Sequence, residues 1–120
     1  VLKKGGTFIF DVLQDKDIEN KTSPKTWDAN NSGFWKESPY LALSESFFYP
    51  EEKVILFQHN IIDTMDNIET YRFWTHFFSK SDVRKMLEPN SFIDIRFRED
   101  ILPNEDIWSG DNVIFTITSK

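Results

Sequence analysis

Near its start the chain carries the sequence LKKGGTFIFDVL, residues 2–13, which gives the strongest indication of the fold. After Gly5-Gly6, β-branched and aromatic residues follow almost without a break, a pattern typical of a strand buried on both faces. We predict such a strand over residues 7–13, preceded by the tail of a helix that ends in a glycine cap. Because a buried strand needs neighbouring strands and covering helices, we expect the chain to begin inside a larger fold.

The composition is acidic, rich in aromatic residues and free of cysteine. The formal net charge of -6 over 120 residues argues against a nucleic-acid partner, because phosphate recognition needs a clustered positive surface. The lack of cysteine excludes disulfides and thiolate metal sites and fits a reducing, cytoplasmic compartment. No apolar run is long enough to span a bilayer, so we predict no membrane partner. The 12 Phe, 4 Trp and 3 Tyr either fill a small β core or line a pocket for an aromatic or sugar-like ligand.

The middle of the chain predicts a long loop followed by an antiparallel meander. Residues 14–38 are mostly polar but contain Trp27, Phe34 and Trp35, which suggests a flap that either folds over a ligand or anchors itself. Short turn clusters then separate three segments of strand character, which are residues 40–49, 54–63 and 68–78. Alternation along the third segment places Tyr71 on one face, and Arg72 and Trp74 on the other.

The last third of the chain predicts one short helix and two strands. Ser79 with Asp82 approximates a capping box, and Pro89 ends the helix after barely two turns. Strands are predicted over residues 92–97 and 112–118, where apolar and β-branched residues are frequent.

These segments, in this order, resemble the C-terminal half of a class I S-adenosylmethionine-dependent methyltransferase. Residues 2–11 resemble the family's L-K-x-G-G-x-x-x-x-D segment, which leads into the fifth strand of its sheet. Residues 77–87 with 92–95 resemble the late helix and sixth strand, and residues 113–117 resemble the seventh strand, which in this family runs antiparallel between the fifth and sixth. The meander resembles the antiparallel lid of a bacterial subgroup that acts on small molecules.

The resemblance implies an α/β fragment, α+β by content. It would contain the last three strands of a Rossmann-like methyltransferase sheet, a three-stranded antiparallel insertion and one or two short helices. We expect a single partial domain over residues 1–120: a turn and buried strand (1–13), a loop and antiparallel lid (14–78), and a helix with two C-terminal strands (79–120). The missing N-terminal half would be a partner. Because exposed strand edges recruit other chains, the edge of residues 7–13 should pair with a second copy or another segment.

The cofactor of the resembled family is S-adenosylmethionine, which we expect to bind the full-length parent and not this chain. The family's glycine-rich loop lies between a first strand and a helix, whereas Gly5-Gly6 is predicted to follow a helix and open a strand. We therefore assign no cofactor-binding residue here and expect the chain to be inactive by itself. A small-molecule methyl acceptor is the implied substrate.

Five residues are candidates for contact with that acceptor. His59 is a candidate general base because its ordinary pKa lies near neutrality, although a lone histidine in a strand is more often structural. Asp11, predicted to end the buried strand, would lie at the carboxyl edge where α/β sheets bind ligands. Either the face of Arg72 and Trp74 or the face of Tyr71 would contact the acceptor.

Metal binding and a non-enzymatic role are the alternatives to this interpretation. The acidic pairs near residues 100 and 105 lack the regular oxygen-ligand spacing and turn glycine of a calcium loop, so no metal is predicted. The alternative function is a β-rich binding or assembly module, with the aromatic sheet face as its interaction surface.

Overall fold

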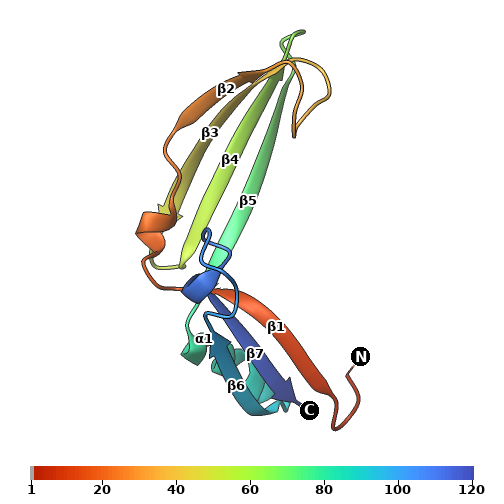
Figure 1. Cartoon of the computed structure of the whole chain (residues 1–120), viewed down its shortest axis with the longest axis vertical. Coiled ribbons are helices and arrows are strands. Elements are labelled where there is room, and N and C mark those ends of the chain that lie inside the picture. Colours follow the sequence, from red (N-terminus) through yellow and green to blue (C-terminus); the bar gives the residue numbers. More distant parts are fainter. Residues whose placement is uncertain (1) are drawn as a thin grey trace. The chain divides into compact units, whose positions relative to one another are not determined.

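The computed structural model describes residues 2–120, so Val1, the first residue of the predicted 1–13 segment, lies outside the described residues. The chain divides into two compact units (Figure 1). Unit 1 comprises the residues up to 18 together with residues 77–120, and unit 2 comprises residues 19–76. The boundaries predicted for a single partial domain stay a prediction.

Unit 1 is built on a sheet whose strand order matches the expected one. Its strands are β1 (Thr7–Gln14), β6 (Ile93–Glu99) and β7 (Val113–Ser119), and β7 lies between the other two and is antiparallel to both. The last residues of β5 (Ile68–Phe78) run parallel to the end of β1, with Leu13 opposite Phe77. The predicted antiparallel position of the last strand is therefore confirmed (Figure 1).

The burial predicted for β1 is wrong. Of its residues only Leu13 is buried, and Ile9 is 62% exposed. The strand also has few neighbours: β7 pairs with one edge of β1 from Thr7 to Leu13, whereas β5 reaches only Leu13 and Gln14 on the other edge. Within residues 2–120, the second edge of Thr7 to Val12 has no strand beside it.

The predicted helix tail before β1 is also wrong, because residues 3–6 form a tight turn. The Gly6 amide donates to the Lys3 carbonyl at 2.8 Å. Gly5 has a φ of 81°, a backbone conformation that would be strained in a residue with a side chain. The Gly5 amide in turn donates to the carbonyl of Lys120, beyond the end of β7. The glycine pair thus fixes where β1 starts against β7.

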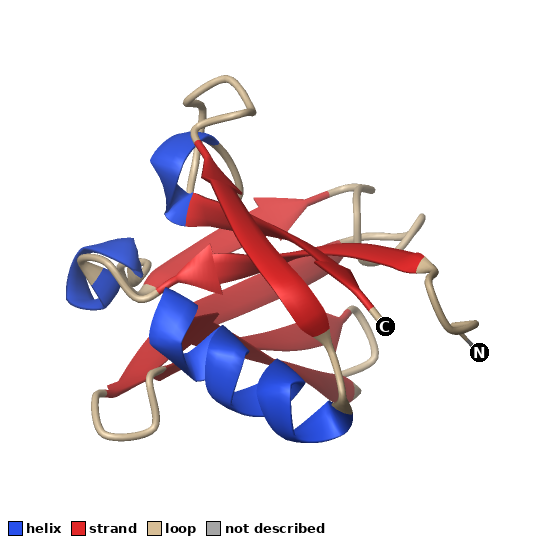
Figure 2. Cartoon of the chain, turned by 90° about the horizontal axis from the view of Figure 1, so that it is seen from below, coloured by secondary structure: helices blue, strands red, loops and turns tan. Residues whose placement is uncertain are grey.

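One α-helix, α1 (Lys80–Leu87), follows β5 and has the predicted limits. Figure 2 shows the helices of the chain in blue beside the strands in red. The Ser79 hydroxyl accepts from the Asp82 amide at 3.0 Å, and the Asp82 carboxylate accepts from the Ser79 amide at 2.8 Å, which completes a capping box. The helix buries Val83 and Leu87, and a 3-10 turn (Glu88–Asn90) containing Pro89 ends it. Two other 3-10 turns span Ile18–Lys21 and Gly110–Asn112.

Replacing Ser79 with alanine should lower the free energy of unfolding by about 1 kcal/mol, because the amide of Asp82 loses its acceptor. Urea unfolding followed by circular dichroism would measure the change. Ser81→Ala is the matched control, since Ser81 is exposed inside the first turn and alanine favours a helix. Equal destabilisation by the two substitutions would contradict the assigned cap.

Unit 2 is a wholly antiparallel sheet in the order β2-β3-β4-β5. The limits of β3 (Tyr40–Tyr49), β4 (Val54–Asp63) and β5 agree with the three predicted segments. The structure adds β2 (Thr26–Asn30), which lies inside the stretch predicted as a loop. Only five residues long and fully exposed, β2 lacks the apolar alternation that identifies a half-buried strand, and its pairing with β3 holds it in place.

The two faces of this sheet carry different side chains. Because directly paired residues point to the same side, the register assigns each side chain to a face. The first, here called the histidine face, carries His59 and Tyr71 and buries Ile55 and Ile61 completely. The second, the tryptophan face, carries Trp27 and Trp74, which are 70% and 55% exposed.

Candidate functional site

The structure brings two of the five predicted site residues together. His59 of β4 and Tyr71 of β5 are direct cross-strand partners on the histidine face. Arg72 and Trp74 lie on the opposite face, and Asp11 belongs to unit 1. The candidate site is therefore built around His59 and Tyr71.

His59 lies beside two aromatic rings and forms a hydrogen bond with one polar partner. Its Nδ1 is 2.7 Å from the Ser44 hydroxyl, which projects from the paired position on β3. The Trp35 and Phe73 rings lie 5.1 Å and 5.9 Å from the imidazole, centroid to centroid. This partial burial lowers the pKa of His59 below its ordinary value, so the imidazole is neutral at neutral pH.

Trp35 reaches the sheet from the polar stretch that was predicted as a flap. Its ring stacks on Tyr71 at 4.9 Å and packs on the buried cluster of Tyr40, Ala42 and Ile61. The loop can approach this closely because Gly33 has no side chain; a Cβ there would lie 2.6 Å from the Tyr40 hydroxyl. Trp35 thus anchors the loop on the histidine face, and a role of the flap over a ligand stays a prediction.

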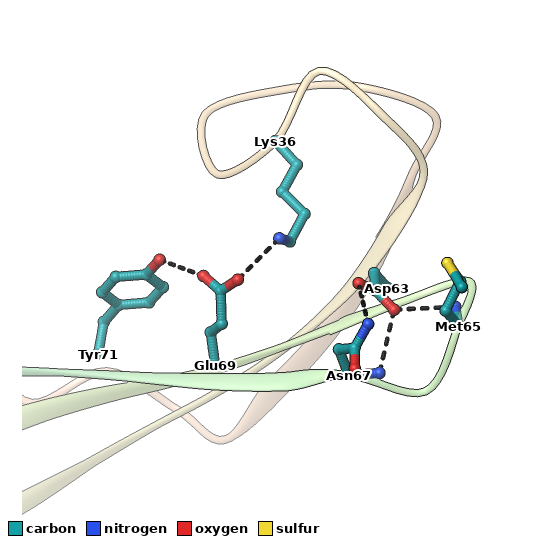
Figure 3. A network of polar contacts seen from close by, with 6 residues as sticks. All are labelled: Lys36, Asp63, Met65, Asn67, Glu69 and Tyr71. Atoms are coloured by element: carbon teal, nitrogen blue, oxygen red, sulfur yellow. Dashed lines mark hydrogen bonds and ion pairs between the residues drawn. The ribbon is translucent and has the colours of Figure 1, made fainter.

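A chain of polar contacts continues from Tyr71 along the sheet (Figure 3). The Tyr71 hydroxyl donates to Glu69, and the Lys36 ammonium donates to the other oxygen of that carboxylate at 3.0 Å. These bonds raise the pKa of Tyr71 and of Lys36 and lower the pKa of Glu69. The phenol is therefore held protonated as a donor, and Lys36 ties the same loop as Trp35 to β5.

A separate network closes the turn between β4 and β5 (Figure 3). Asp63 accepts from the backbone amides of Met65 and Asn67 at 2.8 Å and 3.0 Å, and from the Asn67 side chain at 3.1 Å. These donors lower the pKa of the Asp63 carboxyl, chiefly through Asn67. Both carboxylate oxygens are used by the turn, so the network has a structural explanation.

The histidine face supplies a base more readily than a nucleophile. A neutral imidazole whose Nδ1–H donates to Ser44 leaves Nε2 with a free lone pair, able to take a proton from a hydroxyl or amine. In the other tautomer Ser44 would donate to Nδ1, and Nε2 would carry the proton. The hydrogen bond to Ser44 thus decides whether His59 can act as a base.

The burial of His59 gives a testable pH dependence of stability. An unfolded histidine binds its proton at higher pH than His59 does, so the free energy of unfolding should fall as pH decreases through about 6.5. His59→Gln should remove this component between about pH 5 and 7, above the range in which carboxylates titrate. Urea unfolding at a series of pH values measures it. Ser44→Ala keeps the imidazole and should keep the slope; parallel curves for wild type and His59→Gln would contradict the assignment.

The remaining predicted residues have different surroundings. The Arg72 Nε donates to Gln58 at 2.9 Å, and the Trp74 ring lies 5.9 Å from that of Tyr49, both on the tryptophan face. The prediction that Asp11 ends its strand is wrong, because β1 continues to Gln14. The Asp11 side chain is exposed, and the residue pairs with Phe115 of β7. The strand is longer because Val12 and Leu13 also pair with β7. Asp11 thus lies three residues before the strand end.

The described residues offer no metal site and no glycine-rich cofactor loop. Between Leu2 and Lys120, no cluster of three or more histidine and acidic side chains could hold a metal ion. Gly5-Gly6 closes a turn that opens a strand, whereas a cofactor loop of this fold class opens a helix. No helix of the described part is long and apolar enough to cross a membrane.

The fold matches part of an S-adenosylmethionine-dependent methyltransferase. One solved structure that it resembles is such an enzyme from Clostridium acetobutylicum, with a TM-score of 0.54 and 13% sequence identity, covering 98% of this chain and 46% of that one. Another is the CcbJ methyltransferase from Streptomyces caelestis, with a TM-score of 0.51 and 11% identity, covering 98% and 45%. The chain thus spans about half the length of these structures. No protein-family model and no curated protein matches its sequence.

Proposed function

We propose that this chain is the C-terminal part of an S-adenosylmethionine-dependent methyltransferase that acts on a small molecule. The observation that carries the proposal is the antiparallel β7 between β1 and β6, joined to the likeness to two methyltransferase structures. In this proposal unit 1 supplies the end of the catalytic domain's sheet, and unit 2 is the lid over the acceptor.

Within the lid, we assign proton removal to His59 and acceptor positioning to Tyr71. The neutral imidazole, oriented through Nδ1 by Ser44, would take the proton of an acceptor hydroxyl or amine at Nε2. The Tyr71 hydroxyl, kept protonated by Glu69, would stay a hydrogen-bond donor throughout. Positioning of the acceptor would supply much of the remaining acceleration.

We place the S-adenosylmethionine site outside this chain, since its glycines do not form the loop that such a cofactor requires. Calorimetry of the chain alone with S-adenosylmethionine should show no binding, and the full-length protein should bind it. Transfer of a labelled methyl group to a small-molecule fraction by the full-length protein would then test the activity. Tight binding by the chain alone would refute this placement.

A non-enzymatic binding module remains the second candidate, because the tryptophan face leaves large aromatic side chains in solvent. The two candidates make different predictions for the full-length protein. A binding module would retain its ligand affinity and transfer no methyl group to any acceptor.

A further inference from the structure

The tryptophan face carries a hollow that the proposed methyl transfer does not use. It has a volume of about 330 Å³, and its walls include Lys25, Trp27, Leu43, Glu45 and Asn60, from β2, β3, β4 and the residue preceding β2. This volume is at the small end of known ligand pockets. His59 and Tyr71 point to the opposite face of the same sheet, so the hollow is a separate site.

One wall of the hollow is an aromatic surface open to a ligand. Trp27 is 70% exposed, and the neighbouring Leu43, its direct partner on β3, is 38% exposed. An exposed indole beside an aliphatic side chain favours a flat apolar group, because stacked rings gain both buried area and a specific ring geometry.

The rim of the hollow carries opposite charges in loose contact. The Lys25 ammonium lies 3.8 Å from the Glu45 carboxylate, and their side chains are 83% and 32% exposed. An ion pair this long and this exposed contributes little, so each partner can exchange it for a ligand group of opposite charge. Asn60 uses its amide oxygen to accept from Thr70 at 2.6 Å, which leaves the amide N–H groups for an oxygen acceptor.

We propose that this hollow binds a small aromatic zwitterion of the aromatic amino acid class. The ring would stack on Trp27, and the ligand ammonium would pair with Glu45. The ligand carboxylate would accept hydrogen bonds from the Lys25 ammonium and the Asn60 side-chain amide. Binding of this kind is independent of methyl transfer, and it is measured on the chain itself.

L-phenylalanine is the probe, titrated into the ¹⁵N-labelled chain and followed by NMR. We expect a dissociation constant on the order of 1 mM, with shifts centred on the Trp27 indole N–H and the Asn60 side-chain amide. Trp27→Ala should weaken binding by about 10-fold. Trp74→Ala is the matched control, because Trp74 is an exposed tryptophan on the same face outside the hollow, and it should leave the affinity unchanged.

The charged groups are tested with ligands that each lack one charge. Phenethylamine and 3-phenylpropionate should bind more weakly than L-phenylalanine, and Glu45→Gln should remove the advantage that the ammonium provides. Three results would overturn the proposal. The first is no binding at an L-phenylalanine concentration about ten times the expected dissociation constant. The others are equal weakening of binding by Trp27→Ala and Trp74→Ala, and chemical-shift changes centred on the histidine face.

Discussion

Replacing His59 with glutamine in the full-length protein is expected to reduce the kcat of the proposed methyl transfer by about 10²- to 10⁴-fold, the usual contribution of a general base. Glutamine has a similar reach and can still bond to Ser44, but it cannot accept a proton. The expected loss is therefore in kcat, with KM changed little. Initial rates over a range of acceptor concentrations separate the two constants.

The pH profile distinguishes a base from a merely structural histidine. Because burial lowers the pKa of His59, the acid limb of kcat/KM in the wild type should lie below the ordinary pKa of histidine, and His59→Gln should abolish it. His76→Gln is the control, since His76 is the second histidine of the chain and points to the opposite face. A variant that keeps both kcat and the acid limb would show that His59 is not the base.

Truncating Ile61 to alanine should lower the free energy of unfolding by about 2–5 kcal/mol, the range for a large buried aliphatic side chain. Ile61 is fully buried, and the cluster that it forms with Tyr40 and Ala42 supports Trp35. The lost methyl groups would leave a cavity beneath the ring that covers His59. Urea unfolding followed by tryptophan fluorescence measures the change.

Ile68→Ala is the matched control for this substitution. Ile68 occupies the start of β5 on the tryptophan face and is 64% exposed, so its truncation removes little buried surface. We expect its effect to stay within about 0.5 kcal/mol. Comparable losses at the two positions would contradict the assignment of Ile61 to the core.

The fold was predictable where a segment's pattern reflects its surroundings. The limits of β3, β4, β5 and α1 follow from turn clusters and from the Ser79 cap, which are local features. The short β2 was not predictable, because its position depends on pairing with β3. The burial of β1 was predicted wrongly. An apolar run indicates that a strand is suited to a buried position, but it does not show which neighbours cover that strand.

The candidate site was predictable only residue by residue. His59 and Tyr71 were identified separately, and cross-strand register, which the turn between β4 and β5 sets, makes them partners. Ser44, Glu69 and Lys36 were missed, because a serine or a charged residue in a strand looks like ordinary solvent exposure. Trp35 did give a signal, because it is an isolated tryptophan in a polar stretch. That signal does not reveal which rings Trp35 covers.

Two different strands could compete to pair with the open edge of β1. From Thr7 to Val12 the backbone groups on the side away from β7 can accept one added strand and no more. A strand from the N-terminal part of the proposed methyltransferase and a strand from a second molecule would therefore exclude each other. In the proposed methyltransferase, the strand that pairs first with that edge would decide between the completed sheet and an oligomer, so the order of folding would set the assembly state.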